Sequence, residues 1–228
     1  MERRSGARGN EVTAAGSSRT SVRSLLPTLF AMVACLVIAV AALSRVTLDF
    51  RAWTTEDLRR IRVAERPVDV SELDVVTAAG GQRVLWNGDP AERVYLVTFI
   101  YTRCASACLS LGSAFQQLQA ELHAPSAPSG VRLVSIAFDL AHDTPQALGE
   151  YARRFGVDRE RWLVAAPSTA AERDRLLEQT GVVVIDDGLG GYAHNAAIHV
   201  VVPPGRLVRI FDMAEHREAL AFAAQLAR

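Results

Sequence analysis

The sequence predicts an α/β fold, a mixed sheet flanked by helices, preceded by one apolar N-terminal helix. Continuous apolar runs typical of buried strands alternate with helical patterns between residues 94 and 180, and a hairpin and a helix follow them. Hydrophobic residues make up 50% of the 228-residue chain and charged residues 22%. Most of the chain can therefore bury a sizeable core.

The N-terminal region predicts a membrane anchor. Residues 1–24 are rich in small and polar residues and carry five arginines against two glutamates, whereas residues 25–43 contain no charge. As a helix, the second segment extends about 28 Å, enough to cross the hydrocarbon core of a bilayer. Because the arginines precede it, the positive-inside rule predicts a cytoplasmic tail at 1–24, a transmembrane anchor at 25–43 and a domain in the periplasm.

The chain is therefore expected to be a single-pass protein of the inner (cytoplasmic) membrane. The alternative is a cleaved signal peptide, for which Ala39 and Ala41 supply a weak cleavage motif. In either case the domain faces an oxidising compartment.

The remaining chain divides into a linker at 44–69, in which 54–66 has the pattern of a short capped helix, and one folded domain at 70–228. In the domain, β-branched runs around a Gly-Gly pair predict a hairpin at 73–86. The expected elements after it are a central strand at 94–100, a helix at 104–123, a loop at 124–130, a buried strand at 131–138, a helix at 144–155, a short strand at 162–165, a helix at 169–180, a short strand at 182–185, a glycine-rich loop at 186–193, a hairpin of 198–202 with 207–211, and a final helix at 214–227.

Local signals mark two helix ends. Asp143 is expected to be the N-cap of the helix at 144–155, with Pro145 in its first turn. Gly181 is expected to end the helix at 169–180 in a left-handed conformation.

The charge balance and the cysteines narrow the function. Lys+Arg and Asp+Glu number 25 each, which argues against nucleic acid as a partner. Of the three cysteines, Cys35 lies in the apolar segment as an apolar filler, and Cys104 and Cys108 lie four positions apart. Cys104 falls where the central strand is predicted to end and a helix to begin, a place where α/β sheets collect ligands. A helix N-terminus favours thiolate over thiol, and residues i and i+4 share one helix face.

This cysteine pair has three interpretations. A structural disulfide would close a very short loop and so constrain little chain entropy. A redox pair would resemble that of C-x-x-C enzymes and would need an external thiol reductant in an oxidising compartment. The pattern favours the third, two sulfur ligands of a metal site, provided that a third ligand exists. Two thiolates with one imidazole would suit a soft ion such as Cu(I).

Four segments occur in an order that resembles the SCO/SenC family of membrane-anchored copper chaperones with a thioredoxin fold. They are TFIYTRCASACLSLG, VRLVSIAFDLAHDTPQALGEYARRFG, RWLVAAPSTAAERDRLLEQTGV and YAHNAAIHVVVPPGRLVRIF, within residues 70–228. The resemblance implies a thioredoxin-like sheet and one copper ion, Cu(I) or Cu(II), bound by Cys104, Cys108 and His194. It also places Asp139 close to the metal, where the carboxylate would orient the ligands or balance their charge.

The family acts in building the dinuclear copper site of cytochrome c oxidase, by delivering copper or by keeping the recipient thiols reduced. The resemblance implies a metallochaperone rather than an enzyme. Its partners would be a thiol reductant and a copper recipient, a cytochrome c oxidase subunit. The alternatives are an extracytoplasmic thiol–disulfide oxidoreductase that uses Cys104 and Cys108 without metal, and a copper or redox sensor.

The chain departs from the family pattern around the expected ligands. Leu109 and Leu140 replace prolines that usually follow the second cysteine and the aspartate, and Ala193 and Asn195 flank the histidine where relatives commonly carry Asp and Ser. These replacements predict an altered metal affinity or redox potential. The remaining candidates are expected to be structural or solvated, namely His199 inside a strand, and Arg103, His123, His142 and His216 at the surface.

Overall fold

The computed structural model describes residues 22–87, 94–104, 107–125 and 127–228, and the chain forms two compact units, residues 1–51 and 52–228. In the first unit, α1 (Val22–Val46) contains the stretch Leu26–Val46, which is long and apolar enough to cross a membrane. Its large apolar side chains and Cys35 are exposed. Such a surface is typical of a helix whose surroundings are lipid.

The second unit is built on a mixed sheet of eight strands in the described part of the chain, in the order β1-β10-β9-β4-β5-β6-β2-β3. The strands are β1 (Val68–Asp69), β2 (Leu73–Thr77), β3 (Gln82–Leu85), β4 (Val94–Ile100), β5 (Val131–Ala137), β6 (Trp162–Pro167), β9 (Ile198–Val202) and β10 (Arg206–Phe211). The central strands β4, β5 and β6 run parallel, and the other pairs are antiparallel. This topology confirms the predicted mixed sheet and both predicted hairpins.

The centre of the sheet positions the loops that carry the candidate ligands. All seven residues of β4 are buried, and β4 pairs with β5 in register up to Ile100 opposite Ala137. A strand covered on both faces needs such a continuous apolar run. Because the carboxyl ends of β4 and β5 coincide, the segments leading to Cys104 and to Asp139 leave the sheet side by side.

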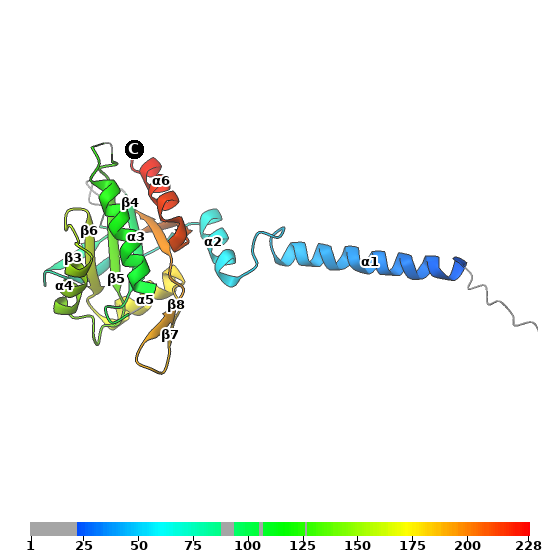
Figure 1. Ribbon diagram of the computed structural model, residues 1–228, viewed down its shortest axis with the longest axis horizontal. Helices are drawn as coiled ribbons and strands as arrows, with labels where there is room; N and C mark the ends of the chain where they lie inside the picture. The colour runs from blue at the N-terminus through cyan, green and yellow to red at the C-terminus, as the bar shows by residue number, and fades with distance from the viewer. Residues whose placement is uncertain (1–21, 88–93, 105–106, 126) are drawn as a thin grey trace, which may run out of the picture. The chain divides into compact units, whose positions relative to one another are not determined.

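Helices flank the sheet as predicted. They are α2 (Thr55–Glu65), α3 (Ala107–Leu122), α4 (Pro145–Arg154), α5 (Ala170–Thr180), the short 3-10 helix η1 (Met213–Glu215) and α6 (His216–Leu226). α3 packs on β5 and on α6, and α6 packs on β4 and β9 (Figure 1). α4 lies against β2 and β6, and α2 lies against β10. Gly181 ends α5 with φ +67°, as the sequence predicts.

Two parts of the chain differ from the sequence-based prediction. Within the expected linker at 44–69, the capped helix expected at 54–66 is present as α2, with a capping box between Thr54 and Asp57. It belongs to the compact unit 52–228, and the linker also contains β1, which pairs with β10. The predicted glycine-rich loop at 186–193 is shorter in the structure, at 187–191, because β7 (Val184–Asp186), which overlaps the strand expected at 182–185, pairs with β8 (Tyr192–His194). Both β1 and β8 are too short to show a strand period in the sequence.

Candidate metal centre

Cys104 lies between the central strand and the helix that follows it. Its amide donates a hydrogen bond to the carbonyl oxygen of Tyr101 over 3.1 Å, and its residue surface is only 5% exposed. The described part of α3 begins at Ala107, so Cys104 precedes the helix instead of forming its first turn. The structure therefore does not show the predicted helix beginning at Cys104. That the two sulfurs face one point stays a prediction, because the side chain of Cys108 lies outside the described residues. Cys104 sits in the loop, and the backbone of Cys108 sits in the first turn of α3.

The side chain of Cys108 lies outside the described residues. Among the side chains that are described, no three His, Cys, Asp or Glu are grouped closely enough to hold a metal ion. The predicted ligand set of Cys104, Cys108 and His194 accordingly remains a prediction.

His194 ends β8 and docks on the central strand. Its Nε2 lies 3.1 Å from the carbonyl oxygen of Phe99, and its ring centroid lies 5.3 Å from that of Phe138. Burial lowers the pKa of His194, although the hydrogen bond to Phe99 opposes this shift. A carbonyl oxygen can only accept, so Nε2 carries the proton and Nδ1 carries the lone pair. A neutral imidazole held in one tautomer is what a metal ion requires of a histidine ligand.

Three aromatic rings hold the β7–β8 ribbon against the ends of β4 and β5. Tyr101, Phe138 and Tyr192 contact one another with ring centroids 5.3 to 5.6 Å apart. The Tyr101 hydroxyl donates to the Tyr192 carbonyl and accepts from the Tyr192 amide, each over 3.2 Å. The ribbon thus brings His194 to the end of the strand from which the chain passes to Cys104.

Asp139 is buried and contacts the residue before Cys104. Its carboxylate accepts from Arg103 over 2.8 Å and lies 2.9 Å from Nδ1 of His142. Burial raises the pKa of Asp139, but the hydrogen bonds from Arg103 and His142 outweigh burial and hold the pKa below its ordinary value. Arg103 and His142 are therefore not merely solvated, as the sequence suggested. They form a cluster of hydrogen bonds with Asp139 next to the cysteine loop, in which Arg103 and Asp139 are an ion pair.

Asp143 forms hydrogen bonds with the same loop. Its carboxylate accepts from the Thr102 amide and hydroxyl over 2.8 and 2.7 Å, and from the Asp139 amide over 2.8 Å. Burial raises the pKa of Asp143, and these hydrogen bonds oppose the shift. The prediction that Asp143 caps α4 is wrong, because Thr144 is the N-cap and its Oγ1 accepts from the Ala147 amide.

Two groups that hold His194 and its strand in place were not predicted from the sequence. They are the carbonyl of Phe99 and the hydroxyl of Tyr101. A backbone acceptor has no sequence signal, and a tyrosine after a strand is ordinary. Two local signs of the ribbon were present, the short strand expected at 182–185 and the Asp187-Gly188 pair, because Asp-Gly favours a turn between strands.

Comparison with known proteins assigns the chain to a family. A family model described as SCO1/SenC matches residues 75–227. A curated relative, the SCO1 protein homolog of Bacillus subtilis (strain 168), is 24% identical over 125 residues, which is 54% of this chain and 64% of the relative. The match therefore spans less than two thirds of that relative's length.

Solved structures of the family share the fold. BsSco, described as a member of the Sco family of cytochrome c oxidase assembly proteins, superposes with a TM-score of 0.61 at 19% identity over 71% of this chain and 95% of its own. Arabidopsis thaliana ScoI with copper bound gives 0.57 at 14% identity over 68% and 98%. These superpositions confirm the thioredoxin-like fold. With two thirds of its length matched by the family model, the chain belongs to the SCO1/SenC family.

Proposed function

We propose that this protein is a membrane-tethered copper chaperone that delivers copper to the dinuclear copper site of cytochrome c oxidase or maintains the thiols of that site. The observation that carries the proposal is the docking of His194 by Nε2 on the Phe99 carbonyl, at the end of the strand that leads to Cys104. The bound copper in Arabidopsis ScoI and the assembly role given for the Sco family support it.

In this proposal, copper is the cargo and the chain supplies its ligands. The thiols of Cys104 and Cys108 lose their protons to solvent on binding, and His194 donates the lone pair of Nδ1. Two thiolates and one imidazole suit Cu(I). Asp139 acts through Arg103, which it holds beside Cys104. With only three ligands, a recipient thiolate can approach, form a new sulfur–copper bond and replace one ligand at a time.

The tether supports delivery to a recipient embedded in a membrane. Leu26–Val46 is long enough to span a bilayer, and the arginines before it favour a cytoplasmic N-terminus and a periplasmic domain. Confinement to a membrane raises the effective concentration of donor and recipient. In an oxidising compartment, Cys104 and Cys108 would also form a disulfide, so a thiol reductant is a required partner.

Copper titration of single variants tests the ligand set. The full-length chain in detergent, reduced with a phosphine, is titrated with Cu(I) against a chromophoric chelator. We expect one ion per chain, a loss of affinity of more than about 100-fold for Cys104→Ser and Cys108→Ser, and about tenfold or more for His194→Ala, because each removes a ligand.

Two matched variants serve as controls for this titration. Cys35→Ser removes the exposed thiol of α1, and His123→Ala removes an exposed imidazole that pairs with Asp158. Both should bind copper as the wild type does. If all three ligand variants keep the wild-type affinity, the copper site is misassigned. Loss of disulfide reduction by metal-free Cys104→Ser would then favour the oxidoreductase alternative.

A further inference from the structure

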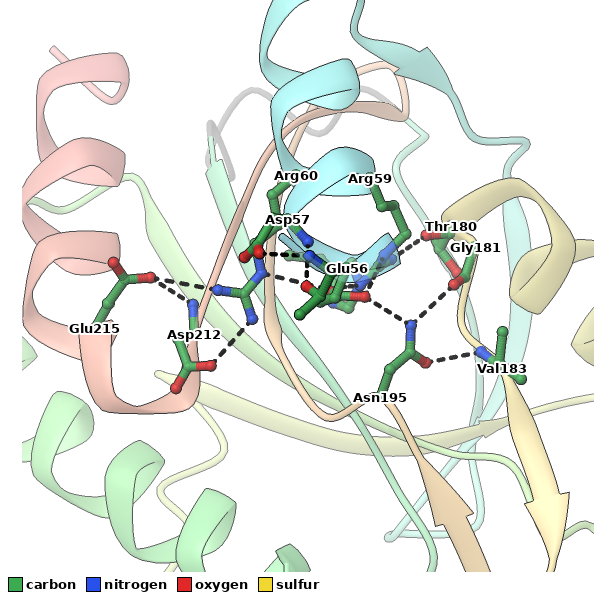
Figure 2. A network of polar contacts seen from close by, with 12 residues as sticks. Glu56, Asp57, Arg59, Arg60, Thr180, Gly181, Val183, Asn195, Asp212 and Glu215 are labelled. Atoms are coloured by element: carbon green, nitrogen blue, oxygen red, sulfur yellow. Dashed lines mark hydrogen bonds and ion pairs between the residues drawn. The ribbon is translucent and has the colours of Figure 1, made fainter. Parts of the chain in front are cut away.

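The side chain next to the proposed imidazole ligand is held at three points. Asn195 accepts with Oδ1 from the Val183 amide over 2.8 Å, and its Nδ2 donates to the Gly181 carbonyl and to Glu56 Oε2, each over 3.1 Å (Figure 2). Asn195 therefore joins the end of α5, the start of the β7–β8 ribbon and helix α2.

Glu56 is itself fixed by two arginines of its own helix. Its Oε1 accepts from Nη2 of Arg59 over 2.6 Å and from Nε of Arg60 over 3.3 Å, and its Oε2 accepts from Nε of Arg59 over 2.9 Å. Burial raises the pKa of Glu56, but the hydrogen bonds from Arg59 and Asn195 outweigh burial and lower it. Glu56 is thus a charged, fully engaged acceptor for the Asn195 amide.

The arginines anchor α2 to the domain on both sides of Glu56. Arg59 donates from Nη1 to the Thr180 carbonyl over 2.5 Å, and its Cδ lies only 3.0 Å from where a Cβ on Gly181 would stand. Arg60 donates from Nη2 to Asp212 over 3.0 Å. The helix cannot shift along the domain without breaking these contacts, so the position of the Glu56 carboxylate is set by the fold.

We propose that Glu56, acting through Asn195, is a positioning residue for the imidazole of His194. The inference depends on the proposed function only in one respect, namely that the imidazole of His194 binds copper. The ring is held at Nε2 by the Phe99 carbonyl, and the backbone that follows it is held by Asn195. Together the two contacts keep Nδ1 in one orientation before the metal arrives, which lowers the cost of ordering on binding.

The length of the Asn195 side chain matters for these contacts. A serine hydroxyl at position 195 would be too short to bridge the three groups that Asn195 joins.

The test measures the imidazole before any copper is added. The full-length chain, labelled with ¹⁵N-histidine and kept in detergent, is examined by two-bond ¹H–¹⁵N correlation for wild type, Asn195→Ala and Glu56→Ala. Glu65→Ala, at the exposed end of the same helix, is the matched control. We expect His194 in wild type and Glu65→Ala to show one tautomer protonated at Nε2. The other two variants should show averaged or broadened ring signals.

Copper titration of the same variants gives the second measurement. Removing an outer partner of a ligand typically costs about 10- to 100-fold in metal affinity, and we expect that loss for Asn195→Ala and Glu56→Ala only. Asn195→Ala keeps the ion pairs of Arg59 and Arg60, so it tests the inference even where Glu56→Ala fails to fold. Unchanged ring signals in a folded Asn195→Ala would overturn the positioning role. A wild type that shows the single tautomer yet binds no copper would instead overturn the proposed function.

Discussion

His199 lies on β9 with no exposed surface, and its Nε2 is 3.3 Å from Nη1 of Arg59. Burial, together with the charge of Arg59, lowers the pKa of His199 to about 3. The residue is a neutral core side chain over the whole physiological range, in keeping with the structural role expected from its place in a strand. His194 and His199 are five positions apart but differ in burial, since His194 is only half-buried.

This burial predicts acid sensitivity. The folded state leaves His199 unprotonated down to about pH 3, whereas the unfolded state binds a proton below about pH 6.5, so stability falls as the pH is lowered through that window. Each pH unit within it costs about 1.4 kcal/mol, or about 2 kcal/mol between pH 6.5 and pH 5. Urea unfolding of wild type at several pH values measures the slope.

His199→Gln is the comparison for this measurement. It should be less stable at pH 7 but should lose about 2 kcal/mol less than wild type between pH 6.5 and pH 5, because the titrating ring is gone. Equal slopes in the two proteins would contradict the burial of a neutral imidazole.

At the scale of elements, α3 approaches the aromatic core closely at Gly112. A Cβ there would fall well inside van der Waals contact of the Phe155 ring. That ring packs on Tyr151 at 4.7 Å and on Trp162 at 6.4 Å between centroids, so it has little room to move. The glycine is needed for the approach of helix and ring, not for any unusual backbone angle.

Alanine at two helical glycines should therefore have opposite effects. Gly112→Ala should destabilise the domain by about 1–3 kcal/mol, because the ring must shift despite the better helix propensity. Gly149→Ala in α4 meets only ordinary contacts, 3.5 Å or longer, and should be neutral or stabilising by up to about 1 kcal/mol. Thermal unfolding followed by circular dichroism distinguishes the two, and a stabilising Gly112→Ala would refute the packing argument.

At the scale of the whole molecule, the folded domain begins earlier in the structure than the sequence predicts, at residue 52 instead of residue 70. The compact unit starts at Ala52 and so includes α2, whose Val63 is buried and whose Arg59 and Arg60 bind the body of the domain. It also includes β1, which pairs with β10 at the edge of the sheet.

Truncation at the two boundaries tests this placement. Residues 52–228 should fold with the circular dichroism and unfolding midpoint of the domain in the full-length chain. Residues 70–228 should be destabilised by about 3 kcal/mol or more, because burial of one valine side chain alone contributes about 1.5–3 kcal/mol. If the two fragments are equally stable, α2 contributes nothing to the stability of the domain and is a linker.

The sequence by itself determined the fold class, the order of the main strands and helices, the apolar N-terminal segment and the candidate cysteine ligands. Each of these depends on a local property: an unbroken apolar run for β4, a proline in the first turn of α4, a cap at Gly181, or a cysteine spacing. The resemblance to the SCO/SenC family added His194 and Asp139 as candidates, and the family match bears out the family itself.

Only the tertiary structure decided how these residues meet. The docking of His194 on the Phe99 carbonyl, the clamp of Asp143 on Thr102 and the contact of Asn195 with Glu56 each join residues far apart in the chain. Strands of two or three residues such as β1 and β8 form because neighbours supply their hydrogen bonds. No local propensity carries such information, since these contacts come into being only once the sheet has brought its distant ends together.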